Sequence, residues 1–188
     1  MFQRLFGRER ARNRQIVEAL YIEIVAAARR ESLFSEWDVP DTPLGRFEMI
    51  ALHMFLVQHR LRGETGVARE IAQDLIDGFF TEVEHSLREL GIGDMGVPKR
   101  MKKLARMYYG RTMTYEAALD SDDRDGLAAA LTRNVRPDLA DWPQAVNLAD
   151  YAFAARGLLR EQAVDTICSG SVVFPQPDAG DPLKSSEP

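Results

Sequence analysis

The chain has little of what most catalytic sites need. Its 188 residues include one cysteine, Cys168, and three histidines, which are His53, His59 and His85. A single cysteine excludes an internal disulfide and a metal site built from several thiolates, and it is typical of a reducing compartment. We interpret Cys168 as a small apolar residue of the core rather than as a nucleophile.

Long apolar runs are also missing. No stretch approaches the roughly 20 apolar residues that span a bilayer, and arginines interrupt the N-terminus where a signal peptide would carry its apolar run. We therefore expect the protein to stay in the compartment where it is made, which we take to be the bacterial cytoplasm. The net charge of −5 argues against a general binder of polyanions such as DNA.

Runs of alternating polar and apolar residues, typical of strands, are absent, whereas helical spacing recurs along the chain. Hydrophobic residues make up 45% of the sequence, enough for one domain with a sizeable core. We predict an all-α fold, a single compact domain of about six helices. The expected helices cover about residues 13–30, 43–61, 67–90, 98–119, 121–134 and 142–168.

The composition divides the chain into three parts. Residues 1–14 form a basic amphipathic segment, which can lie against anionic lipid headgroups or lead as a solvated tail into a helix capped by Asn13. Residues 15–170 form the helical domain. Residues 171–188 are rich in proline and predict a disordered tail.

Residues 38–49, DVPDTPLGRFEM, predict the start of a central helix. Asp41 or Thr42 can cap it, and Pro43 suits its first turn because the missing N–H costs nothing there. Arg46 follows among apolar residues. We interpret it as part of a buried or half-buried ion pair, with recognition of a partner as the alternative.

The stretch from Gly91 to Arg111 organises the rest of the chain. A glycine-rich turn is followed by a basic segment without an acidic residue from Val97 to Arg111. Cations three or four residues apart on a helix therefore repel each other, and no acidic side chain within the segment offsets this repulsion. The pattern indicates an anionic partner; the plainer interpretation is a solvated helix face. An acidic cluster at residues 116–125 follows, and we expect it to form a separate face. The basic segment carries Lys99, Arg100, Lys102, Lys103, Arg106 and Arg111.

Glu82 and His85 match half of a carboxylate-bridged di-iron site in a helical bundle. The second motif is absent, and Phe79, Val83 and Leu87 take the core side of this helix, so we expect no metal site. Nucleotide-binding loops, a nucleophile elbow and zinc-protease motifs are also absent. A helical metal or redox enzyme, or an RNA-binding module at the ribosome, remains as an alternative function.

Three stretches carry a family resemblance: DVPDTPLGRFEMIALH at 38–53, SLRELGIGDMGVPKRMKK at 86–103 and YYGR at 108–111. They resemble the ubiquinol–cytochrome c chaperone family, assembly factors of the cytochrome bc1 complex, and the resemblance extends over about residues 15–169. The departures are mild: Leu90 and Ile92 stand where methionine and valine are common.

The resemblance implies an all-helical protein without enzymatic activity or a cofactor, located peripherally at the inner membrane. It also implies a client, newly made cytochrome b, and in mitochondrial members a small partner protein and a place near the ribosomal exit. Haem contact through His53 or His85 is open. We expect the client to contact a basic rim on an apolar groove, made of Lys99, Arg100, Lys102, Lys103 and Arg106, with Arg46 as a further contact.

Overall fold

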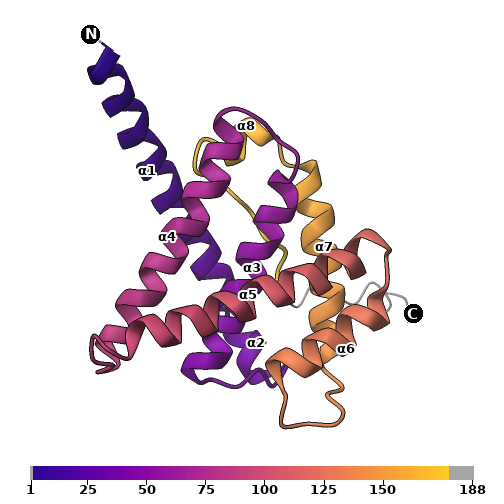
Figure 1. Ribbon diagram of the computed structural model, residues 1–188. Helices are drawn as coiled ribbons and strands as arrows, with labels where there is room; N and C mark the ends of the chain where they lie inside the picture. Colours follow the sequence, from indigo (N-terminus) through magenta and orange to yellow (C-terminus); the bar gives the residue numbers. More distant parts are fainter. Residues whose placement is uncertain (1, 178–188) are drawn as a thin grey trace.

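Helices account for all regular structure in the residues described by the computed structural model, 2–177 for the backbone and 11–177 for the side chains. The all-α prediction is therefore confirmed for this part of the chain (Figure 1). Its eight helices are α1 (Phe2–Ala28), α2 (Glu31–Ser35), α3 (Pro43–Leu61), α4 (Val67–Glu89), α5 (Val97–Asp120), α6 (Arg124–Val135), α7 (Ala145–Glu161) and α8 (Val164–Ile167).

Helix α3 is the centre of the domain, as its apolar circumference predicts. It contacts α1, α4, α5, α6 and α7, and Met49, Met54 and Val57 on it are fully buried. Thr42 caps the helix, because its Oγ1 accepts a hydrogen bond from the N–H of Gly45 at 3.1 Å. Of the two caps that the sequence allows, Asp41 and Thr42, the structure uses Thr42.

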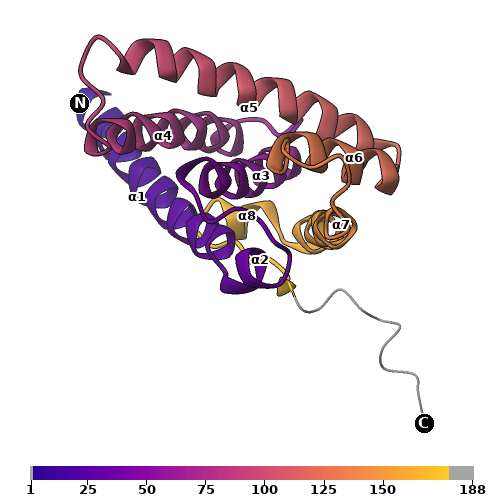
Figure 2. The ribbon, with the colours of Figure 1, turned by 90° about the horizontal axis from the view of Figure 1, so that it is seen from below.

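The other long helices form layers around α3. Seen from below, α5 runs along one outer side, α1 and α2 lie on the opposite side, and α4 and α3 lie between them (Figure 2). Helices α6 and α7 pack against each other at one end. One side of helix α5 therefore packs against the rest of the domain, and its other side faces solvent along its whole length.

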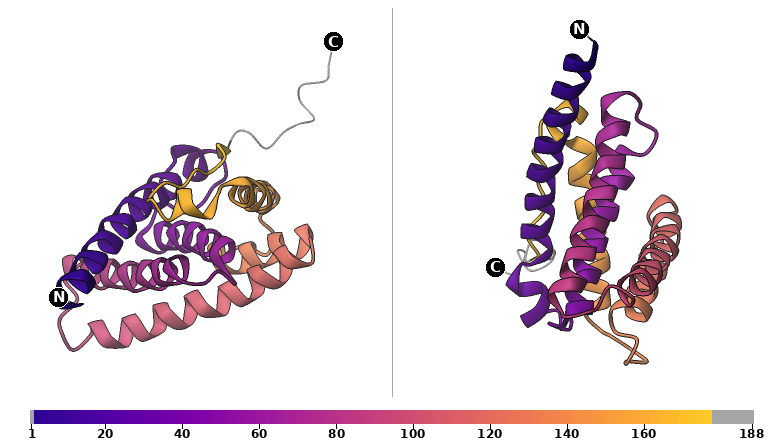
Figure 3. Two further views of the ribbon diagram at one scale, coloured as in Figure 1. Left: turned by 90° about the horizontal axis from the view of Figure 1, so that it is seen from above. Right: turned by 60° about the vertical axis from the view of Figure 1, so that its left-hand side comes forward.

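The N-terminal half of the chain differs from expectation in two places. Helix α1 is continuous from Phe2, so Asn13 lies inside it and caps nothing, and the boundary expected at residue 14 does not interrupt it (Figure 3). The side chains of residues 1–10 lie outside the described part. A short helix, α2, forms in the segment expected to be irregular, and its Leu33 is fully buried in the core.

The C-terminal part holds two further differences. The last expected helix breaks after Glu161, where Gln162 adopts an extended conformation and separates α7 from α8. Residues 171–177, assigned to the tail from sequence, lie against the domain: Val172 and Phe174 are buried, and the side chain of Gln162 bonds both backbone groups of Val173. Residues 178–188 lie outside the described residues.

Candidate partner-binding site on helix α5

Five exposed cations lie on the first turns of α5, and we call them the basic face: Lys99, Arg100, Lys102, Lys103 and Arg106. Among the described residues, none of them forms an ion pair with a carboxylate; the nearest pairs along the chain belong to Arg88 and Arg111. Lys99 and Lys103, and likewise Lys102 and Arg106, are four residues apart, so like charges face each other. The basic face is thus an unneutralised surface on an acidic protein.

The acidic cluster lies at the opposite end of α5 and has its own partners. Arg62 forms ion pairs with Glu116 and Asp120, and His59 Nε2 lies 2.9 Å from Asp120 Oδ1. The bonds from Arg62 and His59 hold the pKa of Asp120 well below its ordinary value. Asp122 pairs with Arg156. The two charged regions are separate, as expected, and the acidic one does not neutralise the basic face.

Aromatic stacking joins α5 to α4 directly after the basic face. Tyr108 packs on Phe79 with ring centroids 5.6 Å apart and on Phe80 at 5.7 Å. Tyr109 contacts both Phe80 and Tyr108, and half of its side chain stays exposed. Gly110 does not end the helix here, since α5 is continuous to Asp120.

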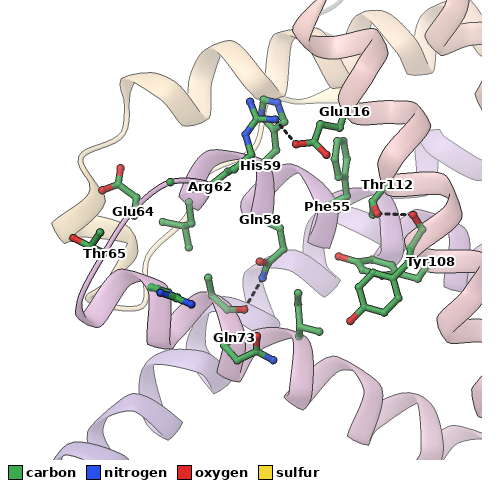
Figure 4. A pocket seen from close by; sticks show the side chains of 16 residues that line it. Phe55, Gln58, His59, Arg62, Glu64, Thr65, Gln73, Tyr108, Thr112 and Glu116 are labelled. Atoms are coloured by element: carbon green, nitrogen blue, oxygen red, sulfur yellow. Dashed lines mark hydrogen bonds and ion pairs between the residues drawn. The ribbon is translucent and has the colours of Figure 1, made fainter.

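A groove of about 610 Å³ opens between α3, α4 and α5 (Figure 4). Gln58 spans its base, where its Nε2 donates a hydrogen bond to the carbonyl of Ala72 at 2.8 Å. Tyr109, one helical turn beyond Arg106, belongs to both the groove and the end of the basic face. The apolar lining comes from Phe55, Leu61, Ala72, Ile76, Tyr108 and Tyr109, and the polar rim from His59, Arg62, Glu64, Arg69, Gln73 and Glu116.

Arg46 does not join this site. Its Nε lies 2.6 Å from Oδ1 of Asp41, both side chains are more than half exposed, and the hollow that Arg46 lines contains no residue of α5. The ion pair expected at Arg46 is present, but it is exposed and not buried or half-buried as expected. Any contribution of Arg46 to client binding stays a prediction, and it would come from a second surface.

The buried ion pair of this region is Glu48–Arg111, which sequence reasoning missed. Arg111 was expected to face solvent with the other cations, but its side chain is 12% exposed and that of Glu48 is 2% exposed. Arg111 Nη2 lies 2.8 Å from Glu48 Oε1. Burial raises the pKa of Glu48 to about 7, against the opposing effect of Arg111. A signal was available in the sequence: both residues lie in the stretches that carry the family resemblance.

His53 is a structural residue of the core. Its Nδ1 donates to the carbonyl of Met49 at 2.8 Å, and its Nε2 lies 2.7 Å from the hydroxyl oxygen of Tyr151, from which the neutral ring accepts a hydrogen bond. Burial lowers the pKa of His53 to about 4. With both nitrogens bonded and no exposed surface, His53 has no position left for haem iron.

Glu82 and His85 are exposed on α4, as expected. Within residues 11–177, no three His, Cys, Asp or Glu side chains gather closely enough to hold a metal ion. Cys168 is half-buried and packs against the core, where burial raises the pKa of its thiol. None of the helices in the described part of the chain is long and apolar enough to cross a membrane.

Comparisons with known proteins agree on one family. Ubiquinol-cytochrome-c reductase complex assembly factor 1 of Xenopus laevis is 26% identical over 163 residues, covering 84% of this chain and 81% of the frog protein. The assembly factor of the same name from Mus musculus is 25% identical over 129 residues, 69% of this chain and 43% of the mouse protein. This chain therefore spans less than half of the mouse relative.

A crystal structure of the Cbp3 homolog from Brucella abortus matches with a TM-score of 0.88 and 51% sequence identity, covering 96% of this chain and 100% of that one. Both vertebrate relatives are named as assembly factors and not as enzymes, as the resemblance implied. Residues 35–174 match the family model described as Ubiquinol-cytochrome C chaperone. With most of its length matched, the chain belongs to the ubiquinol–cytochrome c chaperone family.

Proposed function

We propose that this protein is a non-enzymatic chaperone that binds newly made cytochrome b and so supports assembly of the ubiquinol–cytochrome c reductase complex. The family and its named assembly factors support the role in assembly. The observation that carries the choice of site is the position of the basic face, whose unpaired cations end beside the apolar groove.

The chemistry of this site fits an unassembled membrane protein. Such a client exposes apolar helices joined by polar loops, and an amphipathic groove receives the apolar side chains of a helix at intervals of three or four residues. The groove admits a few such side chains against Phe55, Ile76 and Tyr109. The cations of the basic face then pair with carboxylates or phosphates at the end of the bound segment.

The client also sets the place of action. Because cytochrome b is a membrane protein, we expect the chaperone to work at the inner membrane as a peripheral protein, near ribosomes that synthesise the client. A small partner protein remains an expectation of the family resemblance. The proposed client contacts lie on two separate surfaces: the basic face with the groove and, on a different side, Arg46 beside Asp41.

Crosslinking in cells tests the proposal. The tagged protein is crosslinked, membranes are solubilised, and the captured proteins are identified; we expect enrichment of cytochrome b. Reversal of Lys99, Arg100, Lys102 and Lys103 to glutamate is expected to lower that enrichment at least tenfold, since about 1 kcal/mol is lost for each cation that no longer meets an anionic surface.

A matched control reverses Arg133 and Arg160, two exposed cations on α6 and α7, and is expected to capture cytochrome b like the wild type. Unchanged capture by the basic-face variant, folded as judged by circular dichroism, would remove the basic face from the proposal. Salt-sensitive capture of ribosomal RNA in place of cytochrome b would assign the site to RNA, with the exposed ring of Tyr109 available for base stacking.

A further inference from the structure

The turn between α4 and α5 exposes the most accessible large apolar side chain of the described protein. Met95 is 96% exposed and Leu90 is 61% exposed. The two flank a glycine-rich turn at the corner where α4 and α5 meet, at the lower left of Figure 1. Apolar side chains at such a protruding corner gain nothing from the fold of the protein itself.

The exposure does not come from a loosely formed turn. Gly91 has a φ of +79°, and the backbone closes a Schellman motif: the N–H of Ile92 bonds the carbonyl of Leu87, and the N–H of Gly91 bonds that of Arg88. The next bonds run from Gly96 and Val97 to the carbonyl of Gly93. The backbone of the turn is therefore hydrogen-bonded on both sides of Met95.

The same turn separates an inner from an outer set of side chains. Ile92 is half-buried and lies over Gly96, where an added Cβ would come within 3.1 Å of both the Ile92 side chain and the Arg100 guanidinium. Leu90 and Met95 point away from this packing into solvent. The turn thus presents two apolar side chains outward while its other apolar residue is used internally.

Cations outnumber carboxylates in the chain next to these side chains. Six cations and two carboxylates lie in the stretch from Arg88 to Arg106. One of the carboxylates, Asp94, is paired with Arg88, which leaves Glu89. Three of the six cations are lysines, whose flexible ammonium groups can meet a fluid anionic surface without fixed geometry.

We propose that the α4–α5 turn docks on an anionic lipid bilayer, with Met95 and Leu90 entering the headgroup region and Lys99, Arg100 and Lys103 contacting phosphates. A protruding apolar tip next to exposed cations is the pattern of proteins that lie on membranes. Aliphatic side chains offer no stacking surface to nucleic-acid bases, so the composition of the tip favours lipid over RNA. This docking proposal rests on the proposed function in one respect, namely that the client lies in the same membrane. Docking of the turn would then place the groove beside the client.

Vesicle binding by the full-length protein tests this surface. The probe is a vesicle of phosphatidylcholine with or without phosphatidylglycerol, and binding is measured by flotation. The wild type is expected to bind only the vesicles that contain phosphatidylglycerol. The double variant M95Q/L90Q is expected to bind about tenfold more weakly, because its side chains no longer leave water.

The matched control is M113Q, which changes a methionine that is 72% exposed on α5, outside the turn; its binding is expected to equal that of the wild type. A direct readout comes from M95W. Trp37 and Trp142 are buried, so brominated lipids are expected to quench only the introduced tryptophan.

Unchanged binding by M95Q/L90Q, or no quenching in M95W, would overturn the proposal. Such a result would leave vesicle binding to the basic N-terminal segment or to charge alone. The assay contains no cytochrome b, so its failure is separate from failure of the client crosslink. RNA binding that survives M95Q/L90Q, without vesicle binding by the wild type, would also overturn it.

Discussion

Arg111 and Glu48 face each other inside the bundle, with Nη2 of Arg111 2.8 Å from Oε1 of Glu48. The contact is ionic rather than a well-aligned hydrogen bond, since Glu48 Oε1 and the Nε and Nη1 of Arg111 have no hydrogen-bond partner among the described residues. It ties α5 to α3 on the buried side of the helix that carries the basic face. The pair therefore fixes the position of a helix whose outer side is open.

Removal of one member of this pair is expected to destabilise the protein strongly. Above pH 7, where Glu48 is ionised, Glu48→Met leaves the charge of Arg111 buried without compensation, which costs about 3–5 kcal/mol. Replacement of both residues by methionine is expected to recover most of this loss, because no buried charge remains. Urea denaturation of Glu48→Met, Arg111→Met and the double variant measures the coupling energy between the two residues. Losses of stability that simply add in the double variant would contradict the prediction.

Stability is expected to depend on pH through two buried groups with opposite signs. The pKa of Glu48 is raised to about 7 in the folded protein. Its stabilising contribution to the free energy of unfolding is therefore fully present below about pH 4.5 and is lost as pH rises through 7. The pKa of His53 is lowered to about 4, so its contribution is present above about pH 6.5 and is lost as pH falls through 4. Between pH 4.5 and 6.5 the two effects oppose each other.

Glu48→Gln removes one side of this balance. Between pH 4.5 and 6.5, the free energy of unfolding of this variant is expected to rise with pH more steeply than that of the wild type, since only His53 still acts. Urea denaturation at a series of pH values measures the slope. Glu82→Gln, a change at an exposed site, serves as control and should follow the wild type; the same slope in all three proteins would refute the assignment.

Two glycines of the family-resembling stretches are expected to respond oppositely to alanine. A Cβ on Gly45 would lie 1.9 Å from the carbonyl oxygen of Pro40, so G45A is expected to cost about 1–3 kcal/mol through overpacking. A Cβ on Gly110 meets nothing within 4 Å, so G110A in an exposed helix is expected to stabilise by about 0.5–1 kcal/mol. Thermal unfolding measures both; loss of stability in G110A would show that an unrecognised contact exists there.

Local patterns in the sequence predicted the long helices well. The apolar spacing of Ile71, Leu75 and Phe79 predicts a helix over residues 67–90, within a residue of the observed ends of α4. These predictions succeed because helical periodicity and capping act over a few neighbouring residues. The basic face was visible for the same reason.

Tertiary contacts decided the rest. Arg46 and Glu48 lie two residues apart on a helix with apolar residues around most of its circumference, so the pattern does not tell which of them faces inward. The partner of Glu48, Arg111, comes from a distant helix. Residues 171–177 look like a tail by composition, and their order depends on Gln162 and on the ring of His53, 5.0 Å from that of Phe174.

The basic face lies at the N-terminal end of α5, where positive side chains lower the stability of the free protein. The N-terminus of an α-helix carries a partial positive charge from its aligned peptide dipoles, and α5 has no acidic residue in its first turn. Any anionic partner that docks there relieves this electrostatic strain and binds the folded state alone. The true partner should therefore raise the melting temperature of the protein further as its concentration increases, so that a thermal-shift screen of candidate anionic partners can identify it.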